Sequence, residues 1–241
     1  MSLLSVEHLD ARHGLLVAVR DVTIAVEPGE ILALVGANGA GKTTLLRAIA
    51  GAHRASAGRI GLDGVDVTKV SASRRTRLGI ALVPEGRRLF GGLTVEENLL
   101  VAGQTGRSGR WNYDSVLEAF PMLRPLTKRR GGDLSGGQQQ ATAIGRALMT
   151  NPRLLLVDEL SLGLSPRAVD TVYESLQSVL GPQSTIVLVE QDLSRVMRVA
   201  TRVACMLEGR IVLEGRTSDV TREQITEAYF GLRRTAREVG A

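Results

Sequence analysis

The chain of 241 residues is 44% hydrophobic and 23% charged and carries a formal net charge of +5, which fits a globular protein with a substantial core. Aromatic residues account for only 3%. This argues against base stacking as the main activity, and we expect no nucleic-acid partner. The positive charge instead fits phosphate ligands or anionic surfaces. The densest basic clusters are Arg74 to Arg77 and Lys128 to Arg130, where a solvated surface is the simpler interpretation and a nucleic-acid patch is the alternative.

The single cysteine, Cys205, excludes a disulfide within the chain and indicates a reduced, cytosolic thiol. The first residues lack the basic start and long apolar stretch of a signal peptide. No apolar run approaches the roughly 18 residues that span a bilayer. We therefore expect any membrane association to be peripheral.

The first third of the chain is rich in strand patterns. A turn, E-P-G-E, separates two of them. A helix pattern begins after Gly41 and stops at Gly51. The predicted strands lie at residues 3–9, 22–26, 30–35, 59–64 and 80–84.

The pattern becomes helical between residues 94 and 150. Thr94, followed three residues later by Glu97, forms a capping box. Two further segments, S-V-L-E-A-F and Q-Q-A-T-A-I-G-R-A-L-M, have helical spacing. Buried strands that alternate with helices predict an α/β fold with a parallel sheet. Strand patterns return at residues 153–159 and 185–191 and in a hairpin at 202–213.

The segment G-A-N-G-A-G-K-T-T fits the phosphate-binding pattern G-x-x-x-x-G-K-[ST], between a predicted strand and a predicted helix. Its glycines let backbone N–H groups point inward as an anion cradle, and the helix N-terminus adds partial positive charge. Lys42 can reach the β- and γ-phosphates, and the Thr43 hydroxyl can bind Mg²⁺. The predicted nucleotide-binding residues of this loop are Gly36, Ala37, Asn38, Gly39, Ala40, Gly41, Lys42, Thr43 and Thr44.

A second segment, R-L-L-L-V-D-E, ends an apolar strand in two carboxylates. Ligands of α/β sheets bind at the carboxyl ends of the strands, so Asp158 is expected beside the phosphate loop, where it would hold Mg²⁺ through water. Glu159 would orient or deprotonate the attacking water. Without the phosphate loop, a solvated turn would be the better interpretation of this pair.

A third segment, L-S-G-G-Q, directly precedes a predicted helix. Ser135, Gly136, Gly137 and Gln138 could present a hydroxyl and bare N–H groups at a helix N-terminus, which would form a second anion site. A capping turn with Ser135 as N-cap explains the pentapeptide equally well.

In this order and at this spacing, the three motifs resemble those of the ATP-binding cassette (ABC) ATPases over residues 3 to about 231. The resemblance implies an α/β fold with a P-loop NTPase, RecA-like core, an antiparallel β arm and an inserted helical subdomain. It also implies a head-to-tail dimer, in which each ATP lies between the phosphate loop of one subunit and the signature loop L-S-G-G-Q of the other. A single ABC ATPase domain over 1–241 would comprise the core and arm at 1–84 and 151–231, the helical signature subdomain at about 85–150, and a frayed tail at 232–241.

Four segments narrow the resemblance: V-P-E-G-R-R-L-F-G-G-L-T-V-E-E-N-L, A-I-G-R-A-L-M, D-E-L-S-L-G-L-S-P and L-V-E-Q are similar to those of branched-chain amino-acid importer ATPases, especially the second of their two ATP-binding subunits. Urea and short-amide importers use similar subunits. The resemblance implies an ATP hydrolase that uses ATP and Mg²⁺ at the cytoplasmic face of the membrane. Its partners would be transmembrane permease subunits, a second ABC ATPase or a second copy, and indirectly a periplasmic or lipid-anchored substrate-binding protein.

Five positions, Gln191 among them, depart from the general cassette pattern. Glu85 replaces a glutamine; it is a candidate metal ligand, and a loop residue that faces the permease is the alternative. His13 stands where an aromatic residue stacks on adenine; imidazole offers less stacking area, and an exposed arm histidine is the alternative. Leu160 replaces a proline, and Leu164 replaces an aspartate that couples the two ATP sites.

Gln191 stands where the family carries a switch histidine. The apolar run before it is expected to deliver Glu190, Gln191 and Asp192 to an edge of the molecule. Glutamine keeps hydrogen-bonding capacity but carries no positive charge, so it stabilises the transition state less. Losing a contact worth about 1–3 kcal/mol would slow hydrolysis roughly five- to hundredfold. The predicted catalytic residues are Lys42, Glu159 and Gln191.

Two other functions stay open. One is a structural partner that binds ATP and hydrolyses it weakly; Lys42, Asp158 and Glu159 argue against it, whereas Gln191 and Leu160 favour it. The other is a soluble cassette that acts on ribosomes or nucleic acid. Such proteins usually carry two cassettes or a long coiled-coil insertion, and these 241 residues hold neither. The transported substrate is not encoded in this chain, because the permease and the binding protein select it.

Overall fold

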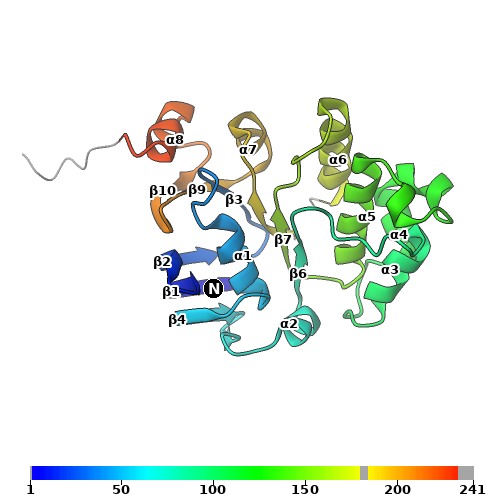
Figure 1. Ribbon diagram of the computed structural model, residues 1–241, viewed down its shortest axis with the longest axis horizontal. Coiled ribbons are helices and arrows are strands. Elements are labelled where there is room, and N and C mark those ends of the chain that lie inside the picture. The colour runs from blue at the N-terminus through cyan, green and yellow to red at the C-terminus, as the bar shows by residue number, and fades with distance from the viewer. Residues whose placement is uncertain (1, 180–183, 233–241) are drawn as a thin grey trace, which may run out of the picture.

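The computed structural model describes residues 2–179 and 184–232. A six-stranded sheet has the strand order β10-β9-β3-β8-β7-β6, and a four-stranded sheet has the order β2-β1-β4-β5. Figure 1 shows the smaller sheet on one side of α1 and a group of helices beyond β6 and β7 on the other. The two sheets form separate layers with α1 between them.

The strands are β1 (Leu4–His13), β2 (Leu16–Val26), β3 (Ile31–Val35), β4 (Ala55–Leu62), β5 (Val65–Asp66), β6 (Ile80–Val83), β7 (Leu154–Asp158), β8 (Thr185–Val189), β9 (Arg202–Leu207) and β10 (Arg210–Arg216). The α-helices are α1 (Lys42–Ala50), α2 (Ala72–Leu78), α3 (Val95–Gly103), α4 (Tyr113–Ala119), α5 (Gly136–Leu148), α6 (Pro166–Val179), α7 (Leu193–Val199) and α8 (Arg222–Tyr229), with short 3₁₀ helices at Pro121–Leu126 and Gly131–Asp133.

The larger sheet is parallel except for its edge strand β10, which pairs antiparallel with β9. All five residues of β7 and all five of β8 are buried, as expected of central parallel strands covered on both faces. The predicted parallel α/β sheet and the predicted hairpin at its end are therefore confirmed. Parallel pairing brings the carboxyl ends of β3, β7 and β8 to one edge of the sheet.

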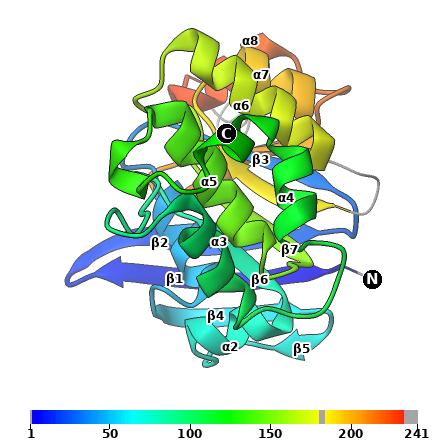
Figure 2. The same cartoon turned by 90° about the vertical axis from the view of Figure 1, so that its right-hand side faces the viewer.

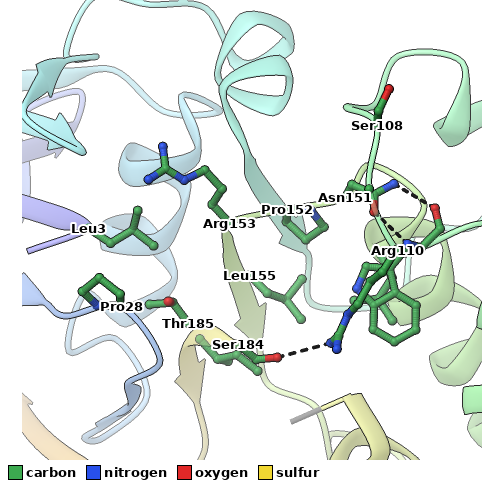
Figure 3. Close-up of a pocket in the computed structure, with 14 residues that line it drawn as sticks. Leu3, Pro28, Ser108, Arg110, Asn151, Pro152, Arg153, Leu155, Ser184 and Thr185 are labelled. Atoms are coloured by element: carbon green, nitrogen blue, oxygen red, sulfur yellow. Dashed lines mark hydrogen bonds between the residues drawn. The ribbon is translucent and has the colours of Figure 1, made fainter. Parts of the chain in front are cut away.

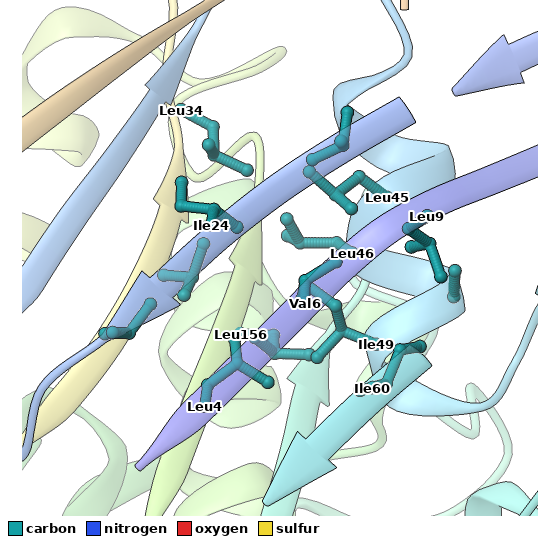
Figure 4. Close-up of a cluster of buried hydrophobic side chains, with 14 of the residues drawn as sticks. Leu4, Val6, Leu9, Ile24, Leu34, Leu45, Leu46, Ile49, Ile60 and Leu156 are labelled. Atoms are coloured by element: carbon teal, nitrogen blue, oxygen red, sulfur yellow. The ribbon is translucent and has the colours of Figure 1, made fainter. Parts of the chain in front are cut away.

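Alternation along the central strands divides the core into layers. Leu32 and Leu34 of β3 pack with α1 and the four-stranded sheet, whereas Ala33 and Val35 pack with α7 and α8. In β7 and β8, one set of side chains joins the α1 layer and the other joins the helices α3 to α6. Figure 4 shows the α1 layer, and Figure 2 shows the helices α3 to α6 in front of the sheet.

The β arm is longer than the sequence patterns predict. β1 runs on to His13 and β2 begins at Leu16, so the two strands pair almost to the tip of their hairpin. Register shifts interrupt the pairing, and His8 and Asp21 adopt positive φ angles of 48° and 50°. These irregularities break the strict polar–apolar alternation on which the strand prediction depended.

The cluster Arg74 to Arg77 does not form a continuous basic surface. Arg75 is 2% exposed and donates hydrogen bonds to the carbonyl oxygens of Ala48 and Ile49 at the C-terminal end of α1, both at 2.7 Å. It also reaches the carbonyls of Thr68 and Val70. The guanidinium thus adds a charged donor to the last carbonyl groups of α1, of which Ala48 also accepts from the Gly51 N–H, and the nucleic-acid interpretation loses its central residue.

None of the helices among the described residues reaches the length and apolarity needed to cross a bilayer. The expected frayed tail starts at residue 232, and residues 233–241 lie outside the described part of the chain. The predicted boundaries of the core and the helical subdomain stay predictions.

Candidate functional site

The phosphate loop joins the carboxyl end of β3 to α1, which starts at Lys42. Two of its glycines are required both by conformation and by space. Gly36 and Gly41 have φ angles of 147° and 102°, in the region that glycine favours. A Cβ would lie 2.2 Å from the Met206 carbonyl oxygen at Gly36 and 2.1 Å from that of Ala18 at Gly41. Strands β9 and β2 therefore press directly on the loop and fix its shape.

The ammonium group of Lys42 lies against this loop. It donates hydrogen bonds to the carbonyl oxygens of Gly36 at 2.7 Å and Ala37 at 2.9 Å, and the side chain is 4% exposed. Burial lowers the pKa of Lys42, and the carboxylates of Glu159 and Asp158 oppose that shift. A cation is thus held at the mouth of the loop, within the electrostatic reach of both acidic residues.

Asp158 ends β7 beside Thr43, whose hydroxyl donates to Asp158 Oδ1 at 3.0 Å. Its second oxygen, Oδ2, is buried and has no hydrogen-bond partner among the described residues. Burial raises the pKa of Asp158, the bond from Thr43 lowers it, and the charges of Glu159 and Glu85 raise it further. An unpartnered carboxylate oxygen next to a hydroxyl fits a hard cation such as Mg²⁺.

In the part of the chain that the structure describes, no group of three His, Cys, Asp or Glu residues is placed to enclose a metal ion. Mg²⁺ usually binds through one or two carboxylates together with substrate phosphates and water. Thr43 and Asp158, with Glu85 near enough to affect the Asp158 pKa, are therefore suited to a metal that arrives with a nucleotide.

Glu159 and Gln191 meet at the edge of the sheet. Gln191 Nε2 donates to Glu159 Oε1 at 3.0 Å and to Asn38 Oδ1 of the phosphate loop at 3.1 Å. Glu159 has a φ of 48°, an uncommon left-handed conformation for a residue other than glycine. The three predicted catalytic residues, Lys42, Glu159 and Gln191, thus lie around one loop, and their catalytic roles stay predictions.

The three polar residues after β8, Glu190 to Asp192, lie in different environments. Gln191 reaches the edge, as expected. Asp192 caps α7 by accepting hydrogen bonds from the backbone of Ser194 and Arg195. Glu190, in contrast, is 1% exposed, so the expectation that all three reach an edge is wrong for this residue. The Glu190 carboxylate stays inside the protein because four donors converge on it.

His13, the predicted adenine-stacking residue, lies at the end of β1 and shares a hydrogen bond of 3.1 Å with the Thr44 hydroxyl. Its ring centroid is 4.5 Å from that of His53, with an interplanar angle of 45°. His53 itself bonds to the Arg12 carbonyl. His13 therefore stands next to the phosphate loop with His53 behind it, and its contact with adenine stays a prediction.

The signature segment, Leu134 to Gln138, lies at the start of α5, among the helices α3 to α6, and not beside the phosphate loop. Ser135 caps α5 in a capping box with Gln138, which is the capping turn that the sequence left open as an alternative. Gly136 lies so close to Leu164 that a Cβ would be 2.8 Å from its side chain. Figure 1 places α5 among the helices beyond β7, away from α1. The second anion site, formed by Ser135 to Gln138, stays a prediction.

The unusual Leu160 has a physical explanation in the fold. Its side chain is fully buried in the cluster that contains Val157, Val169 and Leu188. An apolar anchor therefore follows directly after Glu159 and holds the turn against the core.

Sequence reasoning missed several residues around this site. His53 comes just after α1. The buried Tyr173 of α6 and the partly buried Ser161, in the loop after β7, both contact Glu190. A lone glutamate at the end of a five-residue apolar strand is the signal that could have identified Glu190, because a charged group there is either exposed or heavily hydrogen-bonded. No local pattern indicated its partners.

A cavity of about 330 Å³ lies at the opposite edge of the larger sheet, near the start of β7 and β8 (Figure 3). Its polar groups already have partners: Asn151 bonds to the Trp111 backbone in both directions, Arg153 pairs with Asp63 at 2.8 Å, and Arg110 reaches Ser184. The groups that would select a polar ligand are therefore engaged within the protein.

Comparison with known proteins places this geometry in a family. The family model described as ABC transporter matches residues 19–161. The high-affinity branched-chain amino acid transport ATP-binding protein BraG of Pseudomonas aeruginosa is 40% identical over 95% of this chain and 100% of its own. The probable LivF protein of Archaeoglobus fulgidus, described in the same terms, is 34% identical over 83% and 86%. The Nod factor export ATP-binding protein I of Rhizobium etli is 34% identical over 96% and 75%.

Solved structures give the same result. The ADP conformation of an ATP-binding cassette of an ABC transporter is 29% identical and superposes with a TM-score of 0.76, over 96% of this chain and 99% of the other. An ATP-binding subunit of an ABC transporter reaches a TM-score of 0.82 at 27% identity, over 96% and 99%. The predicted resemblance is confirmed: the chain belongs to the ABC transporter family, as an ATP-binding cassette that hydrolyses ATP.

Proposed function

We propose that this chain is the ATP-hydrolysing subunit of an ABC importer for branched-chain amino acids or a related amide. The observation that supports hydrolysis is the convergence of Lys42, Asp158, Glu159 and Gln191 on the phosphate loop. The observation that supports the substrate class is the similarity to BraG over the whole length of that protein. The match to a Nod factor export protein makes the substrate the part that most needs a test.

Each residue of the cluster has a chemical task in this proposal. The loop N–H groups and Lys42 bind the nucleotide phosphates. Thr43 and Asp158, with Glu85 nearby, would hold Mg²⁺, which neutralises phosphate charge when it is bound. Glu159 orients the attacking water and accepts its proton. Gln191 steadies Glu159 through its amide, and His13 would lie against the adenine.

The proposed dimer follows from the position of the signature residues in one chain. The signature residues Ser135 to Gln138 lie away from the chain's own phosphate loop, so they would complete the ATP site of a partner ATPase or of a second copy. Transmembrane permease subunits would hold this dimer at the cytoplasmic face of the membrane, and a substrate-binding protein would deliver the cargo. Intact Lys42, Asp158 and Glu159 make an inert structural partner the weaker alternative.

Uptake measurements test the substrate class. In the source organism, deletion of this gene is expected to abolish uptake of radiolabelled leucine. The unaltered gene should restore it, and a gene carrying Lys42→Ala should not. Loss of urea uptake with normal leucine uptake would assign the amide instead. Normal uptake of both compounds in the deletion strain would contradict the import proposal.

A further inference from the structure

Glu190 is a buried carboxylate with four hydrogen-bond donors from three parts of the fold. Its Oε1 accepts from Ser161 Oγ at 2.8 Å and from the backbone N–H groups of Gln191 at 2.8 Å and Asp192 at 3.2 Å. Its Oε2 accepts from the Tyr173 hydroxyl at 2.6 Å. A buried charged group persists when its hydrogen bonds are fully made, and here they bind the carboxylate to the ends of β7 and β8 and to α6.

The two oxygens of Glu190 face different regions. Oε1 holds Ser161, two residues after Glu159, and the backbone of Gln191. Among the described residues, Oε2 accepts only from Tyr173, on the α6 side. One oxygen therefore serves the segments that carry the two reacting side chains, and the other anchors the carboxylate to a helix.

Glu159 needs such support because its backbone is strained. Its φ of 48° lies in the left-handed region, where a side chain persists only if the surrounding structure imposes it. The turn is fixed directly afterwards, by the buried Leu160 and by the bond from Ser161 to Glu190. On the other side, the Glu159 N–H donates to the Val189 carbonyl at 3.2 Å.

We propose that Glu190 is a positioning residue for ATP hydrolysis: by holding Ser161 and the Gln191 backbone with one oxygen, it fixes the turn of Glu159 and the contact between Glu159 and Gln191. The inference rests on the proposed hydrolytic role of Glu159. Glu190 touches neither the phosphate loop nor the reacting groups directly. Its loss is therefore expected to lower kcat and to leave KM unchanged.

Two variants that each remove one hydroxyl group distinguish a positioning role of Glu190, seen in kcat, from a role in fold stability, seen in the Tm. Ser161→Ala and Tyr173→Phe each remove one donor to Glu190, on opposite oxygens. Tyr173→Phe leaves the buried Oε2 without its donor, so it should lower the Tm more than Ser161→Ala does. In the purified full chain with Mg-ATP, Ser161→Ala is expected to lower kcat about tenfold, with KM within twofold, because small displacements of reacting groups reduce rates strongly. Tyr173→Phe should keep kcat within twofold.

Glu190→Gln provides a second variant on the residue itself. Its amide retains an acceptor oxygen but cannot accept at both positions, so kcat should fall by more than about threefold at constant KM. A kcat within threefold of the unaltered chain for Ser161→Ala and Glu190→Gln, or an equal fall in Tyr173→Phe, would overturn the proposal.

Glu159→Gln, measured under the same conditions, distinguishes a failure of the proposed function from a failure of the proposed role of Glu190. If the unaltered chain shows no hydrolysis that depends on Glu159, the proposed function and the role of Glu190 fail together. If hydrolysis depends on Glu159 but kcat is unchanged in Ser161→Ala and Glu190→Gln, only the proposed role of Glu190 is wrong.

Discussion

The side-chain amide of Gln191 donates a hydrogen bond to the Glu159 carboxylate, with 3.0 Å between Nε2 and Oε1. The same nitrogen lies 3.1 Å from Oδ1 of Asn38, so one residue joins the end of β8 to the phosphate loop and to the carboxylate after β7. Gln191 is therefore placed to hold the Glu159 carboxylate, the predicted general base, although it adds no positive charge to the site.

Gln191→His should accelerate hydrolysis. A protonated imidazole beside Glu159 would supply the charge that the amide lacks, and a gain of roughly five- to hundredfold in kcat corresponds to about 1–3 kcal/mol. Gln191→Ala, which removes both hydrogen bonds, should lower kcat. Steady-state phosphate release from the purified chain measures both variants. An unchanged rate for Gln191→His would show that this position does not limit hydrolysis.

Glu159→Gln should lower hydrolysis by about 10²- to 10⁴-fold, the usual contribution of a general base, while ATP binding is retained. If the ATP-bound dimer then persists, light scattering with Mg-ATP should show twice the mass of the nucleotide-free chain. Glu118→Gln, an exposed glutamate in α4, is the control and should behave like the unaltered chain. Full turnover in Glu159→Gln would assign the base to another residue.

Lys42→Ala should weaken binding of a non-hydrolysable ATP analogue by at least about two orders of magnitude, because it removes the cation at the mouth of an otherwise intact phosphate loop. Titration calorimetry gives the dissociation constant directly. Lys69→Ala removes an exposed lysine of equal charge and should not alter it. Equal affinity of Lys42→Ala and Lys69→Ala would contradict the phosphate-loop assignment.

Asp158→Asn should stabilise the fold at neutral pH while abolishing Mg²⁺-dependent hydrolysis. Burial raises the Asp158 pKa, so the folded state binds this proton more tightly than the unfolded state, and stability falls as pH rises from the ordinary value of 3.8 through the raised folded-state pKa. Asparagine does not ionise, so Asp158→Asn avoids this decrease in the free energy of unfolding. Each kcal/mol gained should raise the Tm by about 2–4 °C.

The pH dependence makes the Asp158 prediction specific. In thermal unfolding with EDTA and without nucleotide, the advantage of Asp158→Asn should shrink as the pH falls and vanish below the unfolded pKa, where both side chains are neutral. The exposed Asp133→Asn should show no such trend. A Tm gain that is the same at pH 3.5 and pH 7.5 would contradict burial of the charge as its cause.

Arg75→Met should destabilise the protein by about 1–3 kcal/mol, because buried carbonyl groups of α1 lose their charged donor. Its neighbour Arg74 on α2 is exposed, so Arg74→Met is a matched control that removes the same charge without this loss. Urea unfolding, with the slope of the transition compared between variants, gives the difference. Equal stability of the two variants would mean that the Ala48 and Ile49 carbonyls find other partners.

The sequence by itself determined the local parts of this protein. The loop between a strand and α1, the capping box at Thr94, the stop at Gly51 and the buried runs of β7 and β8 were predicted correctly. These features depend on neighbours a few residues away: a side chain that caps its own helix, or a continuous apolar strand that can exist only inside a covered parallel sheet.

Only the tertiary structure decided which polar residues work at the site and which support it. Gln191 and Glu190 are adjacent in a strand end, yet one is exposed beside Glu159 and the other is 1% exposed beneath it. Arg75 likewise looked like surface charge and proved to be a buried cap of α1. Several partners of these side chains lie 17 to 32 residues away along the chain, and Asn38 lies 153 residues from Gln191. Because a charged or polar group can be buried only where such distant donors or acceptors converge, its burial is a property of the packed fold and not of the local sequence.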